Sequence, residues 1–422
     1  MKVKKRDGRI VDFNEQKIIR AILAAFESVD GEVTQYAVDK AYNIASYVSG
    51  YFEEDETNPT PGIEEIQDVI EKGLMSTKRK DVAKAYILYR EERNKIRNKN
   101  SALMQSITEK LAASNVQNQN ANMDEHSFGG RMGEARNELM KDYALNYMVS
   151  DMARINHLEN MVYIHDLDSY AVGMHNCLTI PFDDLLANGF NTRQTDVRPA
   201  NSVNTAFQLI AVLFQLQSLQ QFGGVSASHI DWTMVPYVRK SFRKHFNDGL
   251  KYIEEVELPT QAEATEVSIT DESYASHPKA YKYAMDKTYK EASQAAEGMY
   301  HNLNTLQSRS GNQLPFTSIN YGTCTLPEGR MITEVLLNGS LKGVGKLHKT
   351  PIFPCGIFQC MKGVNREEGD PNYDLYKLAL KSTAQRLYPN YVNIDWSVNA
   401  GYDVNDPTTY VSTMGKCKLQ LI

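Results

Sequence analysis

The sequence predicts an α/β protein of two parts, a small helical domain with a β-hairpin over residues 1–97 and a larger α/β domain over residues 98–422. Three observations support this. An Asp-Gly dipeptide between two short extended runs is typical of a hairpin, and four amphipathic helical patterns follow it. A charged, amide-rich stretch from Arg93 to Met123 marks a domain boundary. From Leu314 onward, short apolar runs alternate with helical patterns.

The first domain begins with Lys4–Val11, where the Asp-Gly pair predicts the hairpin turn. Asn14 is positioned to cap the first helix. Four segments with helical spacing then predict a compact bundle beneath a basic hairpin. Their apolar positions are Ile18, Ile19, Ile22, Leu23 and Phe26; Val38, Ala41, Tyr42, Ala45 and Val48; Ile66, Val69, Ile70 and Leu74; and Val82, Ala85, Tyr86 and Tyr89.

The second domain begins with mixed signals. Phe128–Gly133 is rich in glycine without the spacing of a phosphate loop, so we expect a turn there. Helical spacing covers Glu134–His157. Asn201–Gln221 is apolar around much of its circumference, which predicts a helix buried in the fold or in a subunit interface. Tyr237–Glu255 predicts another helix, with many basic residues.

The last third of the chain predicts strands among helices. Residues 259–277 are rich in Thr, Glu and Ser and indicate an irregular surface connection. Phe316–Tyr321 and Pro351–Met361 are expected to contain strands. Asn372–Tyr388 predicts a helix that Pro389 stops.

The basic hairpin suggests a binding site for an anion. Lys5, Arg6 and Arg9 supply cationic donors, and the helix start at residues 15–17 adds backbone N–H groups. Triphosphate is the anion that we expect. The alternative is an ordinary solvated turn.

Composition restricts the class of protein. A net charge of −6 with 23% charged residues argues against a broad nucleic-acid-binding face. No apolar run is long enough for a membrane span and no signal peptide is evident, so a cytoplasmic location is expected. The five cysteines are scattered, which favours free thiols in a reducing compartment. Cys355 and Cys360 are a weak metal signal, and burial in a strand is the favoured interpretation, so no metal site is predicted.

The stretch from Val162 to Phe182 concentrates reactive groups. Two His, two Asp and one Cys are interleaved with apolar side chains. This composition suits a pocket, in which an enclosed thiol can exchange a hydrogen atom as well as a proton. Cys177 is therefore a candidate catalytic residue, although an inert core thiol remains the alternative.

This stretch closely resembles the His-Asp-Leu-Asp to His-Asn-Cys-Leu segment of the anaerobic ribonucleoside-triphosphate reductases, the class III glycyl-radical family. Val3–Arg9 resembles the start of an ATP-cone, the nucleotide-sensing domain that this family often carries. The resemblance extends to Met414. Further segments in the family's order are Arg198–Asn204, Gln221–Gly224, Pro236–Phe242 and Asp370–Asp374.

The resemblance implies a fold and an activity. The ATP-cone of residues 1–97 would precede the first half of a ten-stranded α/β barrel, built of two half-barrels around a finger loop. The activity would be formate-dependent reduction of ribonucleoside triphosphates by thiyl and glycyl radical chemistry, which supplies deoxynucleotides for DNA synthesis. The family also implies a homodimer, ATP and dATP as allosteric effectors, and a radical-SAM activating enzyme as partner.

The resemblance also implies site residues. Cys177 would be the thiol on the face of the sugar opposite the radical. His165, Asp166 and Asn176 are candidates for lining the substrate pocket. Arg239 and Lys244 could contact an effector phosphate or belong to a solvated face. The ATP-cone pattern places Lys5, Arg6, Asn14, Lys17, Ile63, Glu64 and Arg90 at ATP or dATP.

The resemblance breaks near the end of the chain. In the family, Met-Gly-Cys-Arg forms the finger-loop tip, whereas Met414 is followed here by Gly-Lys-Cys-Lys. Cys417, displaced by one residue from the family position, is the second candidate catalytic residue. The zinc site and the glycyl-radical loop would lie in a missing carboxyl-terminal half. We expect this truncated chain to be inactive alone, and we interpret residues 416–422 as read-through, which sequencing the downstream DNA would test.

Two other classes compete with the reductase. One is a non-catalytic ATP- or dATP-binding regulatory or dimerisation protein; the repressors that carry such a cone also carry a zinc ribbon of paired cysteines, which this sequence lacks. The other is a pyruvate formate-lyase type enzyme, which would need two adjacent cysteines at the finger loop and no cone.

Overall fold

The structure is a computed structural model that describes residues 2–6, 9–54, 58–99, 102–112, 126–173, 177–221, 223–256, 267–308, 313–396, 401–403 and 405–410. The chain forms two compact units, residues 1–105 and 106–422. Each unit has its own hydrophobic core, and each is described by itself. In the part of the chain that the structure describes, no helix is long and apolar enough to cross a membrane.

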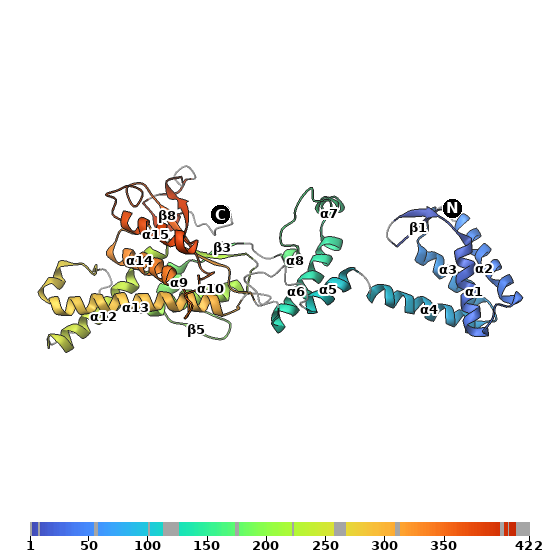
Figure 1. The fold of residues 1–422 in the computed structure, drawn as a ribbon, viewed down its shortest axis with the longest axis horizontal. Coiled ribbons are helices and arrows are strands. Elements are labelled where there is room, and N and C mark those ends of the chain that lie inside the picture. Colours follow the sequence, from blue (N-terminus) through green and yellow to red (C-terminus); the bar gives the residue numbers. More distant parts are fainter. Residues whose placement is uncertain are drawn as a thin grey trace. The chain divides into compact units, whose positions relative to one another are not determined.

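Unit 1 contains the predicted hairpin and four helices. Strand β1 (Lys2–Lys4) pairs antiparallel with β2 (Ile10–Asp12), with Val3 opposite Val11. The predicted Asp-Gly turn lies outside the described residues. The helices are α1 (Glu15–Asp30), α2 (Gln35–Glu53), α3 (Ile63–Ser76) and α4 (Lys80–Lys99) (Figure 1).

The core of unit 1 follows the predicted helical spacing at most positions, but Tyr42 and Tyr89, which were expected on the inner faces, are 49% and 56% exposed. Ile22, Phe26 and Leu74 are fully buried in it, because their positions place them on the inner faces of α1 and α3. The N-cap of α1 differs from the prediction in detail. Asn14 occupies that position but makes no side-chain cap bond, which leaves its amide available to other groups.

The region that follows unit 1 corrects two predictions. The glycine-rich run at Phe128 is not a turn but the start of α6 (Phe128–Tyr143), because the hydroxyl of Ser127 accepts a hydrogen bond from Gly130 N at 3.0 Å and caps the helix. The single helix predicted over Glu134–His157 is interrupted, because Ser150 caps a new helix. The elements here are α5 (Ala102–Ala112), η2 (Ala144–Met148), α7 (Asp151–Leu158) and α8 (Leu167–Tyr170).

A five-stranded sheet organises unit 2, and every neighbouring pair in it is parallel. Its spatial order, β3-β6-β7-β8-β9, follows the order of the chain, and helices connect the strands. The predicted α/β architecture is therefore confirmed, and the sheet is compatible with half of a ten-stranded barrel. The strands are β3 (Leu178–Thr179), β6 (Val225–Ala227), β7 (Thr317–Tyr321), β8 (Cys355–Cys360) and β9 (Asn390–Asn393), with a separate ladder of β4 (Phe190–Asn191) and β5 (Asp196–Val197).

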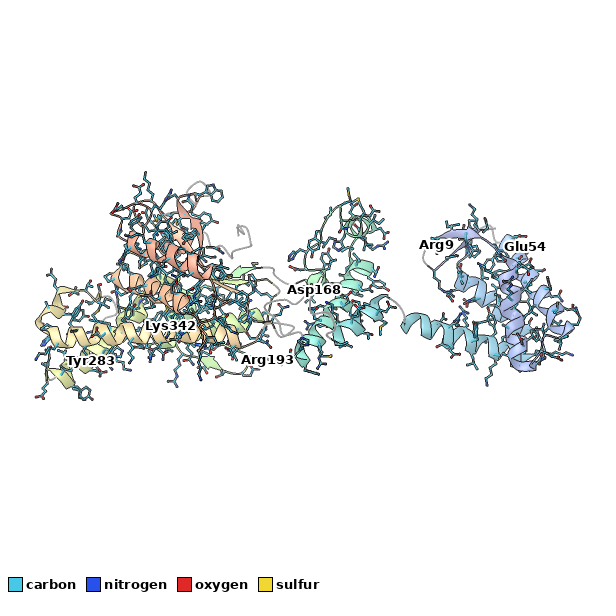
Figure 2. The ribbon with its side chains drawn as sticks, in the orientation of Figure 1. Arg9, Glu54, Asp168, Arg193, Tyr283 and Lys342 are labelled. Carbon is cyan, nitrogen blue, oxygen red and sulfur yellow. The ribbon has the colours of Figure 1, made fainter. Side chains whose placement is uncertain are left out.

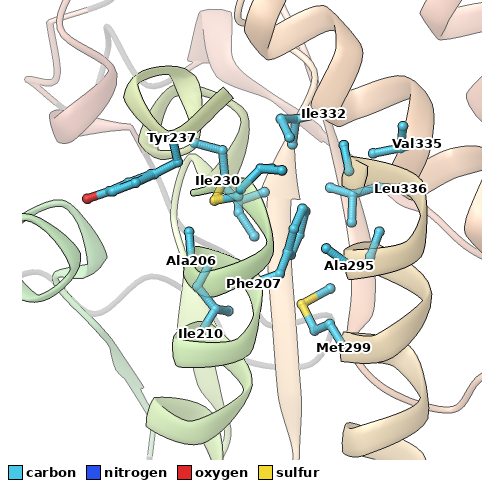
Figure 3. Close-up of a cluster of buried hydrophobic side chains, with 14 of the residues drawn as sticks. Ala206, Phe207, Ile210, Ile230, Tyr237, Ala295, Met299, Ile332, Val335 and Leu336 are labelled. Carbon is cyan, nitrogen blue, oxygen red and sulfur yellow. The ribbon is translucent and has the colours of Figure 1, made fainter. Parts of the chain in front are cut away.

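Helices contribute most of the core of unit 2. The predicted apolar helix is α10, and its residues Phe207 and Ile210 lie fully buried beside Met299 of α13 and Leu336 of α14 (Figure 3). Lys342, labelled in Figure 2, is the last residue of α14. It forms a surface ion pair with Glu297 of α13 at 2.7 Å. The helical elements are α9 (Phe182–Asn188), α10 (Val203–Ser218), α11 (Ile230–Thr233), α12 (Val235–Ile253), η3 (Glu272–Ser276), α13 (Pro278–Thr305), α14 (Pro327–Lys342), α15 (Tyr373–Arg386) and η5 (Pro407–Thr409).

The packing of α14 gives a stability prediction. Leu336 is fully buried, so Leu336→Ala should lower the free energy of unfolding by about 2–5 kcal/mol, the cost of lost burial plus a cavity. Leu347 is 78% exposed, and Leu347→Ala should change it by less than about 0.5 kcal/mol. Urea unfolding of the two variants measures both values. Equal losses would contradict the assigned core.

Candidate functional site

A cavity of about 180 Å³ in unit 1 brings together several residues predicted to bind nucleotide. Lys5 follows strand β1, while Asn14 and Lys17 come from the start of α1. Ile63 opens α3 on the other side. The rest of the lining is mostly apolar, and Asp12, Gln67 and Tyr86 are its other polar members. The cavity thus combines two ammonium groups with a largely apolar wall. This arrangement suits a ligand with an anionic end and a flat apolar end.

The other three predicted nucleotide residues form one ion-pair network beside that cavity. Glu64 accepts from Arg6 Nε at 2.5 Å and from Arg90 Nη2 at 2.7 Å. Arg90 also binds Asp68 and Glu71, each at 2.7 Å. Burial alone would raise the pKa of Glu64, but the two guanidinium groups outweigh it and hold that pKa below its usual range. Glu64 is therefore an ionised bridge between the hairpin and α4.

Cys177 directly precedes β3 and is partly buried. Leu178 N donates to Gly224 O at 3.1 Å, which fixes this end of β3 against β6. Because side chains alternate along a strand, Cys177 is expected on the same face as Thr179, the face opposite to Leu178. Asn176 and Cys417 lie outside the described residues.

The face of the sheet that carries Thr179 is polar. Its registered neighbours include Ser226, Asn320 and Gln359, which are fully buried. The opposite face carries Val225, Ile319 and other core residues that pack under the helices. Among the described residues of the polar face, the side-chain oxygens Ser318 Oγ and Gln359 Oε1 have no hydrogen-bond partner. A buried polar face with unused acceptors is typical of a ligand-binding interior rather than of a helix-covered sheet.

The remaining predicted residues have local partners. His165 Nδ1 contacts Asp166 Oδ1 at 2.5 Å, and the His165 side chain is 75% exposed. Asp166 has a positive φ of 59° and stands at the N-cap of α8.

Arg239 is held in a buried ion pair. Its Nε donates to Glu328 Oε1 at 2.9 Å, and Glu328 is fully buried. Ile269 N donates to the same oxygen at 2.9 Å. Lys244 lies exposed on the same helix, α12. The two residues predicted together as effector contacts therefore differ: Arg239 secures the packing of α12 on α14, whereas Lys244 faces solvent.

The structure also reveals a cavity that the sequence did not predict. It has a volume of about 230 Å³ and lies at the carboxyl ends of β3 and β6, where Asp183, Ser228 and His229 line it. The pairing of Asp183 with His229 spans 46 residues. The only sequence signal is local: Ser228 and His229 directly follow a short apolar strand, where polar residues meet the carboxyl edge of a parallel sheet.

Cys355 and Cys360 both belong to β8, as predicted, and Cys355 is buried. Among the described residues, no group of three or more His, Cys, Asp or Glu side chains is arranged to hold a metal ion.

Comparison with known proteins assigns both units. The family model of the ATP cone domain matches residues 1–95, and that of anaerobic ribonucleoside-triphosphate reductase matches residues 119–422. Together with the parallel sheet, they define an α/β protein that carries an ATP cone in front of a reductase-type domain. The chain belongs to the anaerobic ribonucleoside-triphosphate reductase family.

Individual relatives match most of the chain. The anaerobic ribonucleoside-triphosphate reductase of Haemophilus influenzae is 30% identical over 415 residues, 97% of this chain and 54% of the relative. That of Escherichia coli is 30% identical over 416 residues, 98% of this chain and 54% of the relative. The chain thus spans about half the length of these relatives. A crystal structure of the Thermotoga maritima anaerobic ribonucleotide reductase with dATP and CTP aligns at 14% identity and a TM-score of 0.45, covering 73% of this chain and 50% of that one.

Proposed function

We propose that this chain provides the nucleotide-sensing cone and the first half-barrel of an anaerobic ribonucleoside-triphosphate reductase. The complete reaction would reduce ribonucleoside triphosphates to deoxyribonucleoside triphosphates with formate. In the family that the chain resembles, the first step would use a glycyl radical carried by the second half of the protein. The homodimer, the radical-SAM activating enzyme and the cytoplasmic location expected from the resemblance belong to the same proposal.

One observation carries the regulatory part. Lys5, Asn14, Lys17 and Ile63 come from three separate segments and meet around one cavity of about 180 Å³. The cationic side chains of the lining suit a triphosphate, and its apolar residues with Tyr86 suit a base. We infer that ATP and dATP compete for this cavity.

The polar sheet face supports the catalytic part. Cys177 directly precedes β3. Thr179 of that strand lies on the sheet face that also carries Asn320 and Gln359. The opposite face carries Val225 and Ile319, which belong to the core under the helices. In the proposed reductase the face with Thr179 would line the barrel interior, and Cys177 would face the sugar from there, with His165, Asp166 and Asn176 as further substrate candidates.

Two measurements on the full chain test this function. Calorimetric titration with ATP and dATP should show saturable binding, and its absence would contradict the cone assignment. Reductase activity should appear when the chain is supplied with a polypeptide that carries the second half-barrel, an activating enzyme and formate. Nucleotide binding without any activity in that mixture would instead favour the alternative, a non-catalytic regulatory or dimerisation protein.

The Glu64 bridge gives a prediction about affinity. An incoming triphosphate must share Arg6 and Arg90 with an ionised carboxylate, and like charges repel. Glu64→Gln should therefore tighten ATP binding by roughly fivefold. Asp68→Asn is the matched control, because Asp68 pairs with Arg90 but not with Arg6, and it should have little effect. Weaker binding by Glu64→Gln would mean that the carboxylate contacts the nucleotide favourably.

A further inference from the structure

The cavity of about 230 Å³ in unit 2 lies where binding sites are expected in a parallel sheet, at the carboxyl ends of β3 and β6. Apolar walls are supplied by Ile180, Pro181, Phe182 and Ala227. The polar groups are mostly hydroxyls. They come from Thr179, Ser228, Thr233 and Thr408, beside His229 and Asp183.

Three of these polar residues form a hydrogen-bonded chain. His229 Nε2 lies 2.6 Å from Asp183 Oδ2, and His229 Nδ1 lies 2.7 Å from Ser228 Oγ. The His229 ring is almost wholly buried, whereas Asp183 is half-exposed. Burial would raise the pKa of Asp183, but the hydrogen bond to His229 outweighs it and lowers that pKa, so the carboxylate is ionised at neutral pH.

The ionised carboxylate sets the direction of the chain. A carboxylate can only accept, so Nε2 of His229 carries a proton and donates it to Asp183. When Nδ1 carries no proton, it accepts from the hydroxyl of Ser228 at 2.7 Å. With its own proton directed at His229, the Ser228 oxygen presents its free lone pairs as acceptors. A ligand that donates an O–H to this oxygen would complete the chain.

Neighbouring strands hold this arrangement in place. Gln359 Nε2 of β8 donates to Ser228 O at 2.9 Å, and Asn320 Nδ2 of β7 donates to Ala227 O at 2.9 Å. Both amide side chains are fully buried. Thr233 Oγ1 donates to His229 O at 3.2 Å. Because buried bonds fix the backbone on both sides of Ser228, the site is preorganised and loses little conformational freedom on binding.

We propose that this cavity binds the hydroxyl-bearing sugar of a ligand, with a sugar hydroxyl donating to Ser228 Oγ and the Asp183–His229 pair orienting Ser228. The surrounding threonine hydroxyls supply further partners for a sugar. Only the expectation that the sugar is a ribose rests on the proposed reductase function.

Ribose 5-phosphate, 2-deoxyribose 5-phosphate and inorganic phosphate are suitable probes for the full chain. The readout is the imidazole NMR signal of His229, identified by its loss in His229→Gln. We expect a saturable shift of this signal with ribose 5-phosphate at millimolar concentration and none with phosphate. Ser228→Ala should weaken binding about tenfold, and Asp183→Asn should also weaken it. The 2-deoxy sugar shows whether the 2-hydroxyl is the one recognised.

His245 provides the matched control, because it forms a similar pair with Glu291 at 2.8 Å between α12 and α13 and does not line the cavity. Its signal should not move, and His245→Gln should bind like the unaltered chain. An equal shift with inorganic phosphate would overturn the proposal in favour of an anion site. Unaltered binding by Ser228→Ala would also overturn it, as would the absence of a shift with both sugars. Titration of the same samples with ATP measures nucleotide binding by the cone separately. A loss of ATP binding can therefore be distinguished from a loss of sugar binding at this cavity.

Discussion

Replacing both Lys5 and Lys17 with Ala should lower the affinity of the full chain for ATP by about 100-fold or more. Both side chains line the cavity of about 180 Å³, and no other lysine does so among its described lining residues. A hydrogen bond to a charged group contributes roughly 1.5–3 kcal/mol, so losing two removes at least about 3 kcal/mol of binding free energy. Isothermal titration calorimetry at fixed ionic strength measures the change.

The matched control is the double variant Lys2→Ala with Lys4→Ala. These lysines lie on β1, are exposed and do not line the cavity, yet their removal changes the net charge by the same amount. This control should weaken ATP binding by no more than about threefold, the scale of a screened surface charge. If both double variants weakened binding equally, the hairpin would act only through its overall positive field, and the cavity would not be the nucleotide site.

Glu328→Gln should destabilise unit 2 by about 3 kcal/mol at neutral pH, because it leaves the guanidinium of Arg239 without its buried counter-charge. The Glu328 side chain is 0% exposed and that of Arg239 is 16% exposed, so the pair is largely shielded from water. Urea unfolding of unit 2 measures the loss. Glu297→Gln removes the partner of Lys342 from an exposed pair and should cost less than about 1 kcal/mol.

The same pair predicts a pH dependence. Burial would raise the pKa of Glu328, but Arg239 and backbone N–H groups outweigh it, so that pKa is lowered from its ordinary value of 4.5. A lowered folded-state pKa stabilises the fold above the unfolded-state value, and the contribution is lost as the pH falls through the folded-state pKa. The difference in stability between the unaltered chain and Glu328→Gln should therefore be full at pH 7 and shrink below about pH 4.5. A difference that stayed constant into acid would contradict an ionised Glu328.

Local patterns predicted the parts of the fold that local interactions form. The spacing of Ile18, Ile22 and Phe26 predicted α1, and the Asp-Gly signal predicted the β1–β2 hairpin. The apolar run around Ile210 predicted the buried α10. The glycine-rich run at Phe128 misled, because the capping hydroxyl of Ser127 outweighs the low helix propensity of glycine.

Short strands escaped prediction for a physical reason. Strands β3 and β6 have two and three residues, too few for alternation to be recognised in the sequence. Their pairing is decided by the helices that pack on the sheet, which bury Val225 and Ala227 in the common core. The order of the strands in the sheet also depends on contacts between segments that are far apart in the chain.

The sequence by itself determined the family, the helices of the cone and the identity of Cys177 as a candidate, because these depend on residue types at fixed local spacing. Only the tertiary structure decided which charges meet. It joins Glu64 to Arg6 across 58 residues and to Arg90 across 26. It also joins Arg239 to Glu328 across 89 residues and Asp183 to His229 across 46. Partners so far apart in the chain are selected by how the helices and strands pack, and no local pattern records that choice.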